Sequence, residues 1–244
     1  MDLQTFFTEN PRAAIAFSGG ADSAYLLYAA ARAGADVCAY YVQSELQPAF
    51  ERRDAQRLAR EVGARLRVLQ VSALCVRENP PERCYFCKKA IFAAIAAAAR
   101  EDGYTLLLDG TNASDDAADR PGMRALRELS VRSPLRECGL TKAEIREASR
   151  AAGLFTWDKP AYACLATRIP AGERITPEKL AATERAEDYL FSLGFTDFRV
   201  RYAAGAAKIQ LPAAQWAKLT EHRAEILNFL RQDYTAVTLD LEAR

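Results

Sequence analysis

The Ser-Gly-Gly-Ala-Asp-Ser stretch at residues 18–23 constrains the fold of this 244-residue chain more than any other feature. It follows an apolar run, Ala13 to Phe17, that predicts a buried parallel strand, and it precedes Ala24 to Arg32, which predicts a helix. Glycines in such a turn let backbone N–H groups approach an anion, and the helix N-terminus adds unpaired donors and partial positive charge. The two serines would add hydroxyl donors, and the aspartate could hold a metal ion or orient a water. An ordinary glycine-rich turn is the alternative, but the pattern favours a strand–turn–helix unit that binds a chain of phosphates.

The spacing of this turn distinguishes it from two common phosphate-binding loops. The Walker pattern Gly-x-x-x-x-Gly-Lys-Ser/Thr and the Rossmann pattern Gly-x-Gly-x-x-Gly are both absent from residues 18–23. The turn resembles the pyrophosphate loop of the PP-loop ATP pyrophosphatases, which adenylate a substrate and release pyrophosphate. That resemblance implies ATP as a substrate and cleavage between its α- and β-phosphates.

The composition indicates a protein with a substantial core and no strong electrostatic preference. Half of the residues are hydrophobic, and 33 basic side chains balance 32 acidic ones to a net charge of +1. This balance gives no sign of the basic surface that binds nucleic acid, although a local basic patch could exist. No apolar run approaches the ~18 residues that cross a bilayer, and the first residues lack the basic and apolar regions of a signal peptide. We therefore expect a cytoplasmic protein without a membrane partner, whose six cysteines are thiols or metal ligands rather than disulfides.

Predicted strands and helices alternate over the first part of the chain. After the first strand, periodicity predicts strands at 37–42, 66–71, 104–108 and 129–132, and helices at 49–62, 87–100 and 141–152. Thr141 and Glu144 would form a capping box at the start of the last of these helices, and Gly153 would end it. The alternation is typical of an α/β fold with a doubly wound parallel sheet, which binds ligands at the carboxyl ends of its strands.

The pattern changes near residue 168. Pro170, Gly172 and Pro177 interrupt the alternation. The remaining chain predicts a helix at 178–193, strands at 198–201 and 208–211, a long helix at 213–231 and a last strand at 236–239. We therefore expect a PP-loop ATP pyrophosphatase domain at residues 1–168 and a small α+β domain at residues 169–244.

Three cysteines have a spacing that suits a metal or redox site. Cys84 and Cys87 form a Cys-x-x-Cys pair just before a predicted helix, and Cys164 lies far away in the sequence. The pair could be a redox site or half of a zinc site, but tetrahedral zinc needs four ligands and the single histidine, His222, lies on the polar side of a helix. Three thiolates would suit a four-iron cluster with one iron open to a ligand such as hydrosulfide. The alternative is that these cysteines are unconnected.

The other three cysteines are expected to be structural. Cys38 lies in a predicted strand, Cys75 lies beyond a strand end, and Cys138 precedes Gly139 in a turn. We assign them no role in the candidate site.

Several further stretches resemble the LarE family of ATP-dependent sulfur transferases, which help to make the nickel-pincer nucleotide cofactor of lactate racemase. The resemblance runs over nearly the whole chain, and the matching stretches are 17–23, 43–46, 83–89, 108–112 with Asp115-Asp116, 120–122, 133–135, 139–142, 157–160 and 164–172. Many enzymes share the pyrophosphate loop. The combination of Asp-Lys-Pro-Ala at 158–161 with Cys-Leu-Ala-Thr-Arg-Ile-Pro at 164–170 is much narrower.

Membership of this family would imply a specific reaction. ATP adenylates a carboxylate of pyridinium-3,5-biscarboxylic acid mononucleotide, and sulfur then replaces AMP to give a thiocarboxylate. One branch of the family donates the sulfur of its own cysteine, and another carries three cysteines that bind a [4Fe-4S] cluster, whose open iron could deliver hydrosulfide. The pattern of Cys84, Cys87 and Cys164 resembles the second branch. The resemblance also implies a homo-oligomer whose small C-terminal domain binds substrate and takes part in oligomerisation.

The resemblance assigns roles to residues of the first domain. Asp22, Cys84, Cys87 and Cys164 would be the catalytic residues. The loop residues Ser18, Gly19, Gly20, Asp22 and Ser23 would hold the ATP phosphates and Mg²⁺, and Ser44 and Gly110 would lie at strand ends near the adenosine.

The resemblance also assigns roles to four residues near or within the second domain. Arg168, Arg199 and Arg201 would bind phosphate through their planar guanidinium groups, although a solvated strand face is the alternative for all three. Glu187 matches a metal-binding acid of the family. Its companion acid is Gln210 here, so a surface glutamate is the alternative.

Three other functions are compatible with the same motifs. A tRNA thiolase also combines a pyrophosphate loop with Cys-x-x-Cys and a distant cysteine, but such enzymes usually carry a basic surface or extra zinc modules. An amidotransferase-type synthetase using ammonia is the second, and a non-catalytic nucleotide- or metal-binding protein is the third. For the main function, the sulfur donor could be sulfide, free cysteine or a protein persulfide.

Overall fold

A computed structural model describes residues 1–72, 76–115 and 121–242, and the chain forms two compact units. The first unit contains Met1–Cys75 and Glu82–Tyr162, and the second contains Val76–Pro81 and Ala163–Arg244. The chain therefore enters the second unit twice, first for a short segment and then for its remaining length. The predicted boundary at residue 168 lies close to the second of these crossings, and the assignment of functions to two domains stays a prediction.

A four-stranded parallel sheet forms the centre of the first unit. Its strands are β1 (Arg12–Ala16), β2 (Asp36–Gln43), β3 (Arg65–Gln70) and β4 (Leu107–Leu108), in the order β3-β2-β1-β4. Alternate residues point to opposite faces, so that Ala13 and Ile15 pack into one core cluster while Ala14 and Tyr40 pack into another. Because both faces of the sheet are buried, β1 and β2 consist mostly of apolar residues. These apolar runs are the pattern from which the two strands were predicted.

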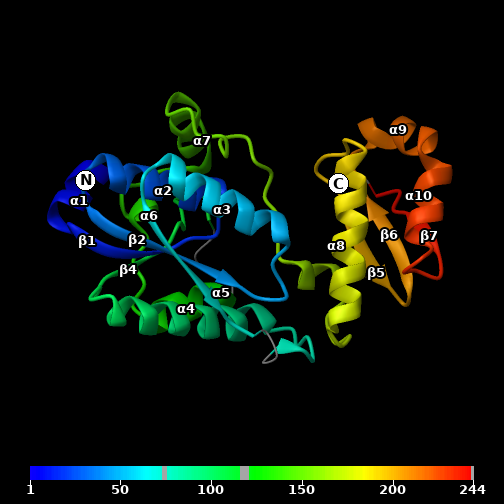
Figure 1. Cartoon of the computed structure of the whole chain (residues 1–244), viewed down its shortest axis with the longest axis horizontal. Helices are drawn as coiled ribbons and strands as arrows, with labels where there is room; N and C mark the ends of the chain where they lie inside the picture. The colour runs from blue at the N-terminus through cyan, green and yellow to red at the C-terminus, as the bar shows by residue number, and fades with distance from the viewer. Residues whose placement is uncertain (73–75, 116–120, 243–244) are drawn as a thin grey trace. The chain divides into compact units, whose positions relative to one another are not determined.

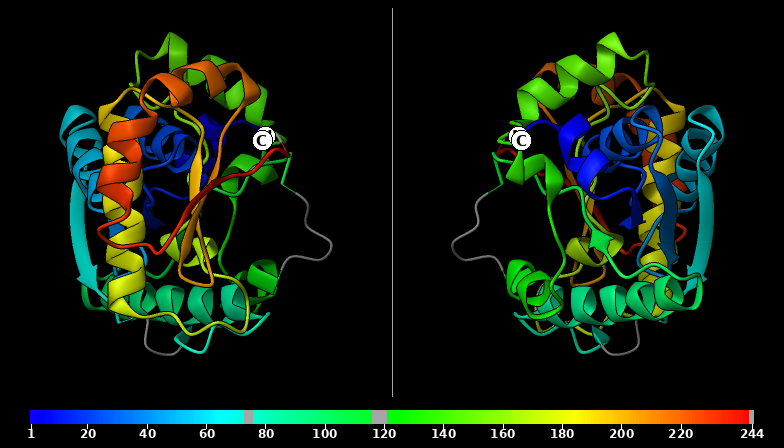
Figure 2. Two further views of the ribbon diagram at one scale, coloured as in Figure 1. Left: turned by 90° about the vertical axis from the view of Figure 1, so that its right-hand side faces the viewer. Right: turned by 90° about the vertical axis from the view of Figure 1, so that its left-hand side faces the viewer.

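Helices cover both faces of this sheet (Figures 1 and 2). One core cluster is surrounded by α1 (Leu3–Glu9), α2 (Ala21–Arg32), α3 (Ala49–Glu61), α6 (Pro134–Glu137) and α7 (Lys142–Ala151). The other is covered by α4 (Arg83–Glu101) and α5 (Pro121–Glu128). This arrangement confirms the predicted α/β fold with a parallel sheet between helical layers. Among the described helices, none combines the length and the apolar character needed to cross a membrane.

The second unit is built on a three-stranded mixed sheet. β5 (Arg199–Ala203) and β6 (Ala206–Gln210) run antiparallel, and β7 (Val237–Leu239) pairs with β6 in parallel. Its helices are η2 (Leu165–Arg168), α8 (Pro177–Ser192), η3 (Ala213–Gln215), α9 (Trp216–Glu221) and α10 (Arg223–Leu230). Leu190 of α8 packs with Val200 and Ile226 in a separate core cluster. The predicted small α+β region at the C-terminus is therefore confirmed.

Several elements differ from the sequence prediction: the predicted strand at 104–108 is reduced to β4, and α1, α5 and α6 were not predicted. α4 begins at Arg83, before the predicted start at Cys87, so the whole Cys-x-x-Cys pair lies inside the helix. The predicted strand at 129–132 is only a single bridge between Leu108 and Arg132, because the neighbouring β4 offers just two residues. The predicted helix at 213–231 is divided at His222, where ψ of 6° ends α9 and the next residue starts α10.

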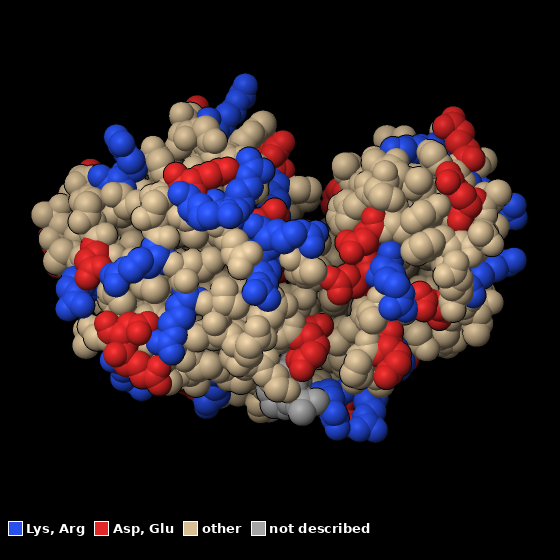
Figure 3. Space-filling view, in the orientation of Figure 1, with Lys and Arg blue, Asp and Glu red and all other residues tan. Residues whose placement is uncertain are grey.

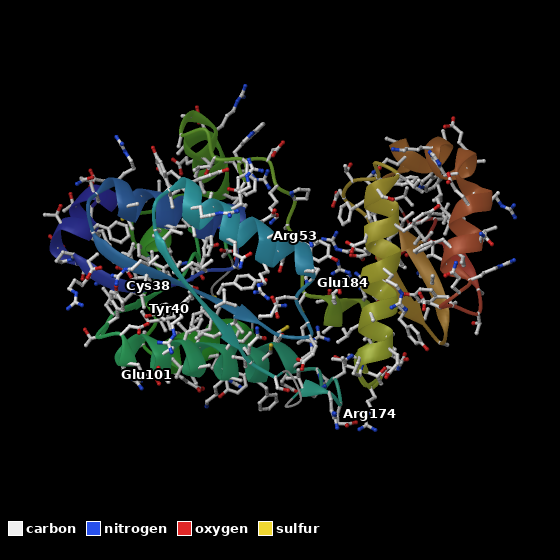
Figure 4. The ribbon with its side chains drawn as sticks, viewed as in Figure 1. Cys38, Tyr40, Arg53, Glu101, Arg174 and Glu184 are labelled. Carbon is white, nitrogen blue, oxygen red and sulfur yellow. The ribbon has the colours of Figure 1, made fainter. Side chains whose placement is uncertain are left out.

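The structural cysteines lie where their sequence context predicted. Cys38 is buried in β2 with Tyr40 on the face covered by α4 (Figure 4), and burial raises the pKa of its thiol. Cys138 ends α6 and packs, partly buried, against the first core cluster. The five described cysteines are thiols, whereas Cys75 lies outside the described residues.

A buried asparagine ties the short segment Val76–Pro81 to the rest of the second unit. Asn79 is fully buried with φ of 52°, and its Nδ2 donates to the carbonyl oxygens of Ile169 (3.2 Å) and Pro170 (2.6 Å). Its own carbonyl oxygen accepts a hydrogen bond from Gly172 N at 2.8 Å. Asparagine tolerates this left-handed conformation better than most residues, so both its backbone and its side chain suit the position.

Replacing Asn79 by alanine is expected to destabilise the second unit. Asn79→Ala would remove the amide that satisfies two carbonyl groups, and we expect the free energy of unfolding to fall by about 1–3 kcal/mol. Trp216, which packs against the core of this unit, can report the urea transition by fluorescence in a Trp157→Phe background, because the chain has only two tryptophans. Asn228→Ala on the exposed face of α10 is the control and should change stability by less than about 0.5 kcal/mol. Equal midpoints for the two variants would contradict this account.

Candidate functional site

Two serine hydroxyls and a packed glycine hold the loop between β1 and α2. Ser18 Oγ and Ser23 Oγ lie 3.1 Å apart, Ser18 N donates to Ser23 Oγ at 3.3 Å, and Gly20 N donates to Ser18 Oγ at 3.3 Å. Gly19 has φ of +73°, and a Cβ atom there would lie 3.3 Å from the carbonyl oxygen of Glu51 in α3. Left-handed backbone and close packing both favour glycine at this position. The loop is therefore held in one conformation by its own residues and by α3.

The N-terminus of α2 offers backbone donors to an anion. Gly20 caps the helix without a side-chain hydrogen bond, and the first helical bond runs from Ala24 N to Gly20 O. The N–H groups of residues 21–23 precede that bond, so they have no partner within the helix. Donors of this kind, together with the partial positive charge of the helix N-terminus, bind phosphate groups.

Gly110 brings the end of β4 against this helix terminus. A Cβ atom at Gly110 would lie 2.8 Å from Ser23 N and 3.0 Å from Ser23 Cα, closer than side-chain carbons approach backbone atoms. The neighbouring Asp109 is buried, and its Oδ1 accepts a hydrogen bond from Ser133 Oγ at 2.6 Å. Of the predicted site residues, Ser18, Gly19, Gly20, Asp22 and Ser23 thus lie together with Gly110.

Asp22 has one carboxylate oxygen paired and the other unsatisfied. Its Oδ2 accepts a hydrogen bond from Lys142 Nζ at 2.5 Å, and Lys142 begins α7 directly after the capping box of Thr141 and Glu144. Its Oδ1 is buried and has no hydrogen-bond donor in the part of the chain that the structure describes. Because a buried oxygen without a partner is costly and Mg²⁺ prefers carboxylate oxygens, Asp22 fits the role of a Mg²⁺ ligand.

A second lysine lies against the same loop. Lys159 Nζ donates to the carbonyl oxygen of Gly19 at 3.2 Å and pairs with Asp54 Oδ2 at 2.6 Å. Its side chain is only 15% exposed. Two ammonium groups therefore flank the loop, one at its aspartate and one at its first glycine, and they would offset part of the negative charge of bound phosphates.

Ser44 follows β2 at the carboxyl edge of the parallel sheet, the edge that also carries the loop. Its backbone N–H donates to Gln47 Oε1 at 3.0 Å, and its Oγ accepts a hydrogen bond from Leu46 N at 3.2 Å. The adjacent Gln43 has a buried Oε1 for which the described residues supply no donor. This edge therefore offers an amide oxygen that could accept a hydrogen bond from a ligand.

The three candidate cluster ligands belong to two different units. Cys84 and Cys87 lie three residues apart near the start of α4, so both are on one side of the helix, and the first is exposed while the second is partly buried. Cys164 precedes η2 in the second unit. Within either unit, the described residues hold no group of three or more His, Cys, Asp or Glu side chains placed to bind a metal. The three-cysteine site stays a prediction.

The predicted phosphate-binding arginines have protein partners in the second unit. Arg199 is buried, and its Nη1 donates to the carbonyl oxygen of Phe198 at 2.6 Å. Arg201 is exposed, and its Nη1 donates to the carbonyl oxygen of Thr167 at 2.8 Å. Arg168 is buried and forms an ion pair with Glu187. Glu187 is therefore buried rather than on the surface, and its role in metal binding stays a prediction.

Comparison with known proteins identifies the family. No protein-family model matches the chain. Pyridinium-3,5-bisthiocarboxylic acid mononucleotide synthase of Lactiplantibacillus plantarum, the LarE enzyme, is 34% identical over 236 residues, which cover 94% of this chain and 86% of the relative. The chain belongs to the LarE family. An uncharacterised protein of Synechocystis sp. is 38% identical over 248 residues, covering 99% of this chain and 92% of the relative. An uncharacterised protein of Methanocaldococcus jannaschii is 28% identical over 235 residues, covering 96% and 91%.

The LarE resemblance left one metal-binding acid without a counterpart, at Gln210. In the structure Gln210 Nε2 donates to Asp240 Oδ2 at 2.6 Å, and Lys208 Nζ pairs with the same oxygen at 2.8 Å. Hydrogen bonds from Lys208 and Gln210 hold the pKa of Asp240 below its usual range. A carboxylate therefore lies next to Gln210, although Asp240 stands in no motif that the sequence could single out.

Sequence reasoning also missed the two lysines at the loop. Lys142 and Lys159 lie within stretches that resemble the LarE family, but neither lies near residues 18–23 in the chain. Lys142 opens a capped helix and Lys159 precedes Pro160, and neither position carries a local signal that points to the loop.

Substitution of Gly110 by alanine is expected to weaken ATP binding. The added Cβ atom would push against Ser23 N and displace the first turn of α2, and such overpacking costs about 1–3 kcal/mol, or roughly 5–150-fold in affinity. Calorimetric titration with the analogue α,β-methylene ATP in the presence of Mg²⁺ measures the effect. Gly34→Ala, just beyond the other end of α2, is a control for destabilisation away from the loop: alanine is strained at its φ of +74°, but its Cβ atom would meet nothing within 4 Å, so the affinity should not change. An unchanged affinity in a folded Gly110→Ala protein would show that the loop does not bind the phosphates.

Proposed function

We propose that this chain is an ATP-dependent sulfur transferase that converts a carboxylate of pyridinium-3,5-biscarboxylic acid mononucleotide into a thiocarboxylate for the nickel-pincer cofactor. The observation that carries the proposal is the 34% identity with the L. plantarum enzyme over 94% of the chain. The uncapped N-terminus of α2 and the unsatisfied Asp22 Oδ1 support ATP and Mg²⁺ as ligands of the loop.

The residues of the loop have distinct roles in this proposal. The N–H groups of residues 21–23 and the hydroxyls of Ser18 and Ser23 bind the β- and γ-phosphates, and Asp22 holds Mg²⁺. Lys142 and Lys159 add positive charge at either end of the loop. These groups stabilise the negative charge that builds on pyrophosphate as it leaves.

The proposed chemistry has two steps and no net oxidation or reduction. In the first, a substrate carboxylate oxygen forms a bond to the α-phosphorus of ATP, and the bond from that phosphorus to pyrophosphate breaks. In the second, a sulfur nucleophile attacks the activated carboxyl carbon, the bond to AMP breaks, and the sulfur loses its proton to solvent. Activation is needed because AMP is a far better leaving group than oxide.

Cys84, Cys87 and Cys164 would hold a [4Fe-4S] cluster in this proposal. Cysteine thiolates are the usual ligands of such a cluster, and the first two cysteines lie on one side of α4. A cluster held by three cysteines would supply one iron that is open to an external sulfide. The proposal requires that the two units bring Cys164 to the other two cysteines.

The charge distribution gives no support to the tRNA thiolase alternative. On the face shown in Figure 3, Lys and Arg side chains gather over α3 of the first unit, with Asp and Glu side chains among them. Within α3, Arg57 pairs with Glu61 at 2.7 Å. The L. plantarum relative is also named for a pyridinium mononucleotide rather than for RNA.

The reaction can be tested by its products. Incubation with the dicarboxylate nucleotide, MgATP and sulfide is expected to give AMP, pyrophosphate and a nucleotide whose mass increases by the replacement of oxygen with sulfur. Asp22→Asn should lower the rate about 10²-fold, the order seen when a group that stabilises developing charge is lost. Glu147→Gln on the exposed side of α7 is the control and should keep the full rate. Formation of ADP and phosphate, or a nucleotide of unchanged mass, would contradict the proposed chemistry.

The cluster can be tested separately from the reaction. After anaerobic reconstitution with iron and sulfide, the wild-type protein should bind about four iron atoms and show visible absorption. Cys84→Ala, Cys87→Ala and Cys164→Ala should each lose iron and repeated turnover, while Cys138→Ala at the end of α6 should keep both. A Cys84→Ala protein that retained the iron and still turned over repeatedly would rule out the three-cysteine cluster.

A further inference from the structure

The most deeply buried charges of the second unit form a single ion pair. Arg168 Nε donates to Glu187 Oε1 at 2.9 Å, and Arg168 Nη2 donates to Glu187 Oε2 at 2.9 Å. Both side chains are 1% exposed. The two parallel hydrogen bonds give the planar guanidinium a fixed orientation inside the unit.

The third nitrogen of Arg168 points at the segment that carries Cys164. Nη1 donates to the carbonyl oxygen of Ala163 and to Thr167 Oγ1, both at 2.8 Å, and reaches the carbonyl oxygen of Cys164 at 3.4 Å. The Cys164 oxygen also accepts hydrogen bonds from Thr167 N and Thr167 Oγ1. The backbone on both sides of the Cys164 side chain is therefore bound to one guanidinium group.

Glu187 connects the same group to the rest of the unit. It lies on α8, and its Oε1 also accepts a hydrogen bond from Val200 N of β5 at 2.8 Å. The Cys164 segment, α8 and β5 consequently meet at one buried carboxylate and one buried guanidinium. The guanidinium donors are directed at protein acceptors, which differs from the phosphate-binding role that the sequence predicts for Arg168.

A buried ion pair of this kind is better explained by geometry than by stability. Desolvation of two charges offsets most of their attraction, so such a pair adds little to folding compared with apolar side chains of the same size. The pair does provide hydrogen-bond partners in fixed positions for buried backbone groups, which need such partners in the interior.

We propose that Arg168 and Glu187 are positioning residues that hold the Cys164 thiol in the orientation needed for sulfur transfer. The purpose of the positioning, sulfur transfer, rests on the function proposed above. The positioning itself concerns the second unit and can be measured without any turnover. Neither residue needs to touch the nucleotide or the transferred sulfur.

The first measurement is the alkylation rate of Cys164 in the full-length protein after removal of metal with a chelator. Iodoacetamide labelling is followed residue by residue with mass spectrometry, and Cys138 in the first unit serves as an internal standard. Without the Arg168 guanidinium the segment should open more often, so Arg168→Gln should speed Cys164 labelling by about 10–100-fold, the range expected when a charged hydrogen bond is lost. Arg168→Lys, which keeps the charge and one donor, should restore part of the slow rate.

A matched control lies on the same helix. Arg185 forms an ion pair with Asp233, but its side chain is 53% exposed, so Arg185→Gln should leave the labelling rate of Cys164 unchanged. Glu187→Gln keeps the shape of the pair but removes the negative charge. It serves as the second test variant if Trp216 fluorescence shows that Arg168→Gln does not fold. Unchanged Cys164 labelling in a folded Arg168→Gln protein, or in Glu187→Gln where Arg168→Gln does not fold, would overturn the proposal.

Kinetics then separate a positioning role from a binding role. If the pair orients the thiol, kcat for thiocarboxylate formation should fall about tenfold or more in Glu187→Gln while the KM values for ATP and the nucleotide stay close to wild type. A higher nucleotide KM with unchanged labelling of Cys164 would instead assign Arg168 to phosphate binding and overturn the proposal. Absence of thiocarboxylate in the wild type would reject the proposed function alone, because the labelling result does not depend on it.

Discussion

The close approach of Gly110 to the N-terminus of α2 is the contact on which the candidate ATP site depends. A parallel sheet places the ends of β1 and β4 side by side, but only the absence of a side chain at Gly110, two residues after β4, allows this approach, because a Cβ atom there would lie 2.8 Å from Ser23 N. The contact closes one side of the loop, while Gly19 against α3 closes the other. The N–H groups of residues 21–23 are left as the open side, which is where an anion is best stabilised.

The division of the chain into two units places the candidate cluster cysteines on different units. Cys84 and Cys87 follow the first short passage through the second unit, and Cys164 lies at the start of the second passage. Inside that unit the two passages are hydrogen-bonded to each other, because Asn79 bridges to the carbonyl oxygens of Ile169 and Pro170. Cys84 lies five residues along the chain from Asn79, and Cys164 lies five residues before Ile169.

Much of the fold could be predicted because its signals are local. The apolar runs of β1 and β2, the capping box at Thr141 and the glycine loop each depend on residues close together in the chain. The errors arose where distant contacts decide the outcome. The region at 129–132 lacks a long partner in β4, and the break at His222 lies inside an unbroken apolar periodicity. Val76–Pro81 joins the second unit through contacts with residues about 90 positions later, such as those of Asn79 with Ile169 and Pro170. Lys142 and Lys159 reach the loop only through the tertiary fold, so no spacing rule could reveal them.

Arg168 illustrates why residue type alone does not settle a role. A guanidinium presents parallel N–H groups that match a phosphate and a carboxylate equally well, so the phosphate-binding role that the LarE resemblance implies for Arg168 stays a prediction. Which group the guanidinium binds depends on whether a carboxylate is buried within its reach. Here that carboxylate is Glu187 of α8, a helix that begins after the loop containing Gly172. Once that carboxylate is present, leaving the guanidinium to reach a phosphate would strand a buried negative charge, which is far more costly than the loss of an exposed ion pair. The pairing therefore follows from the burial of Glu187, and the orientation of the Cys164 backbone follows from the pairing.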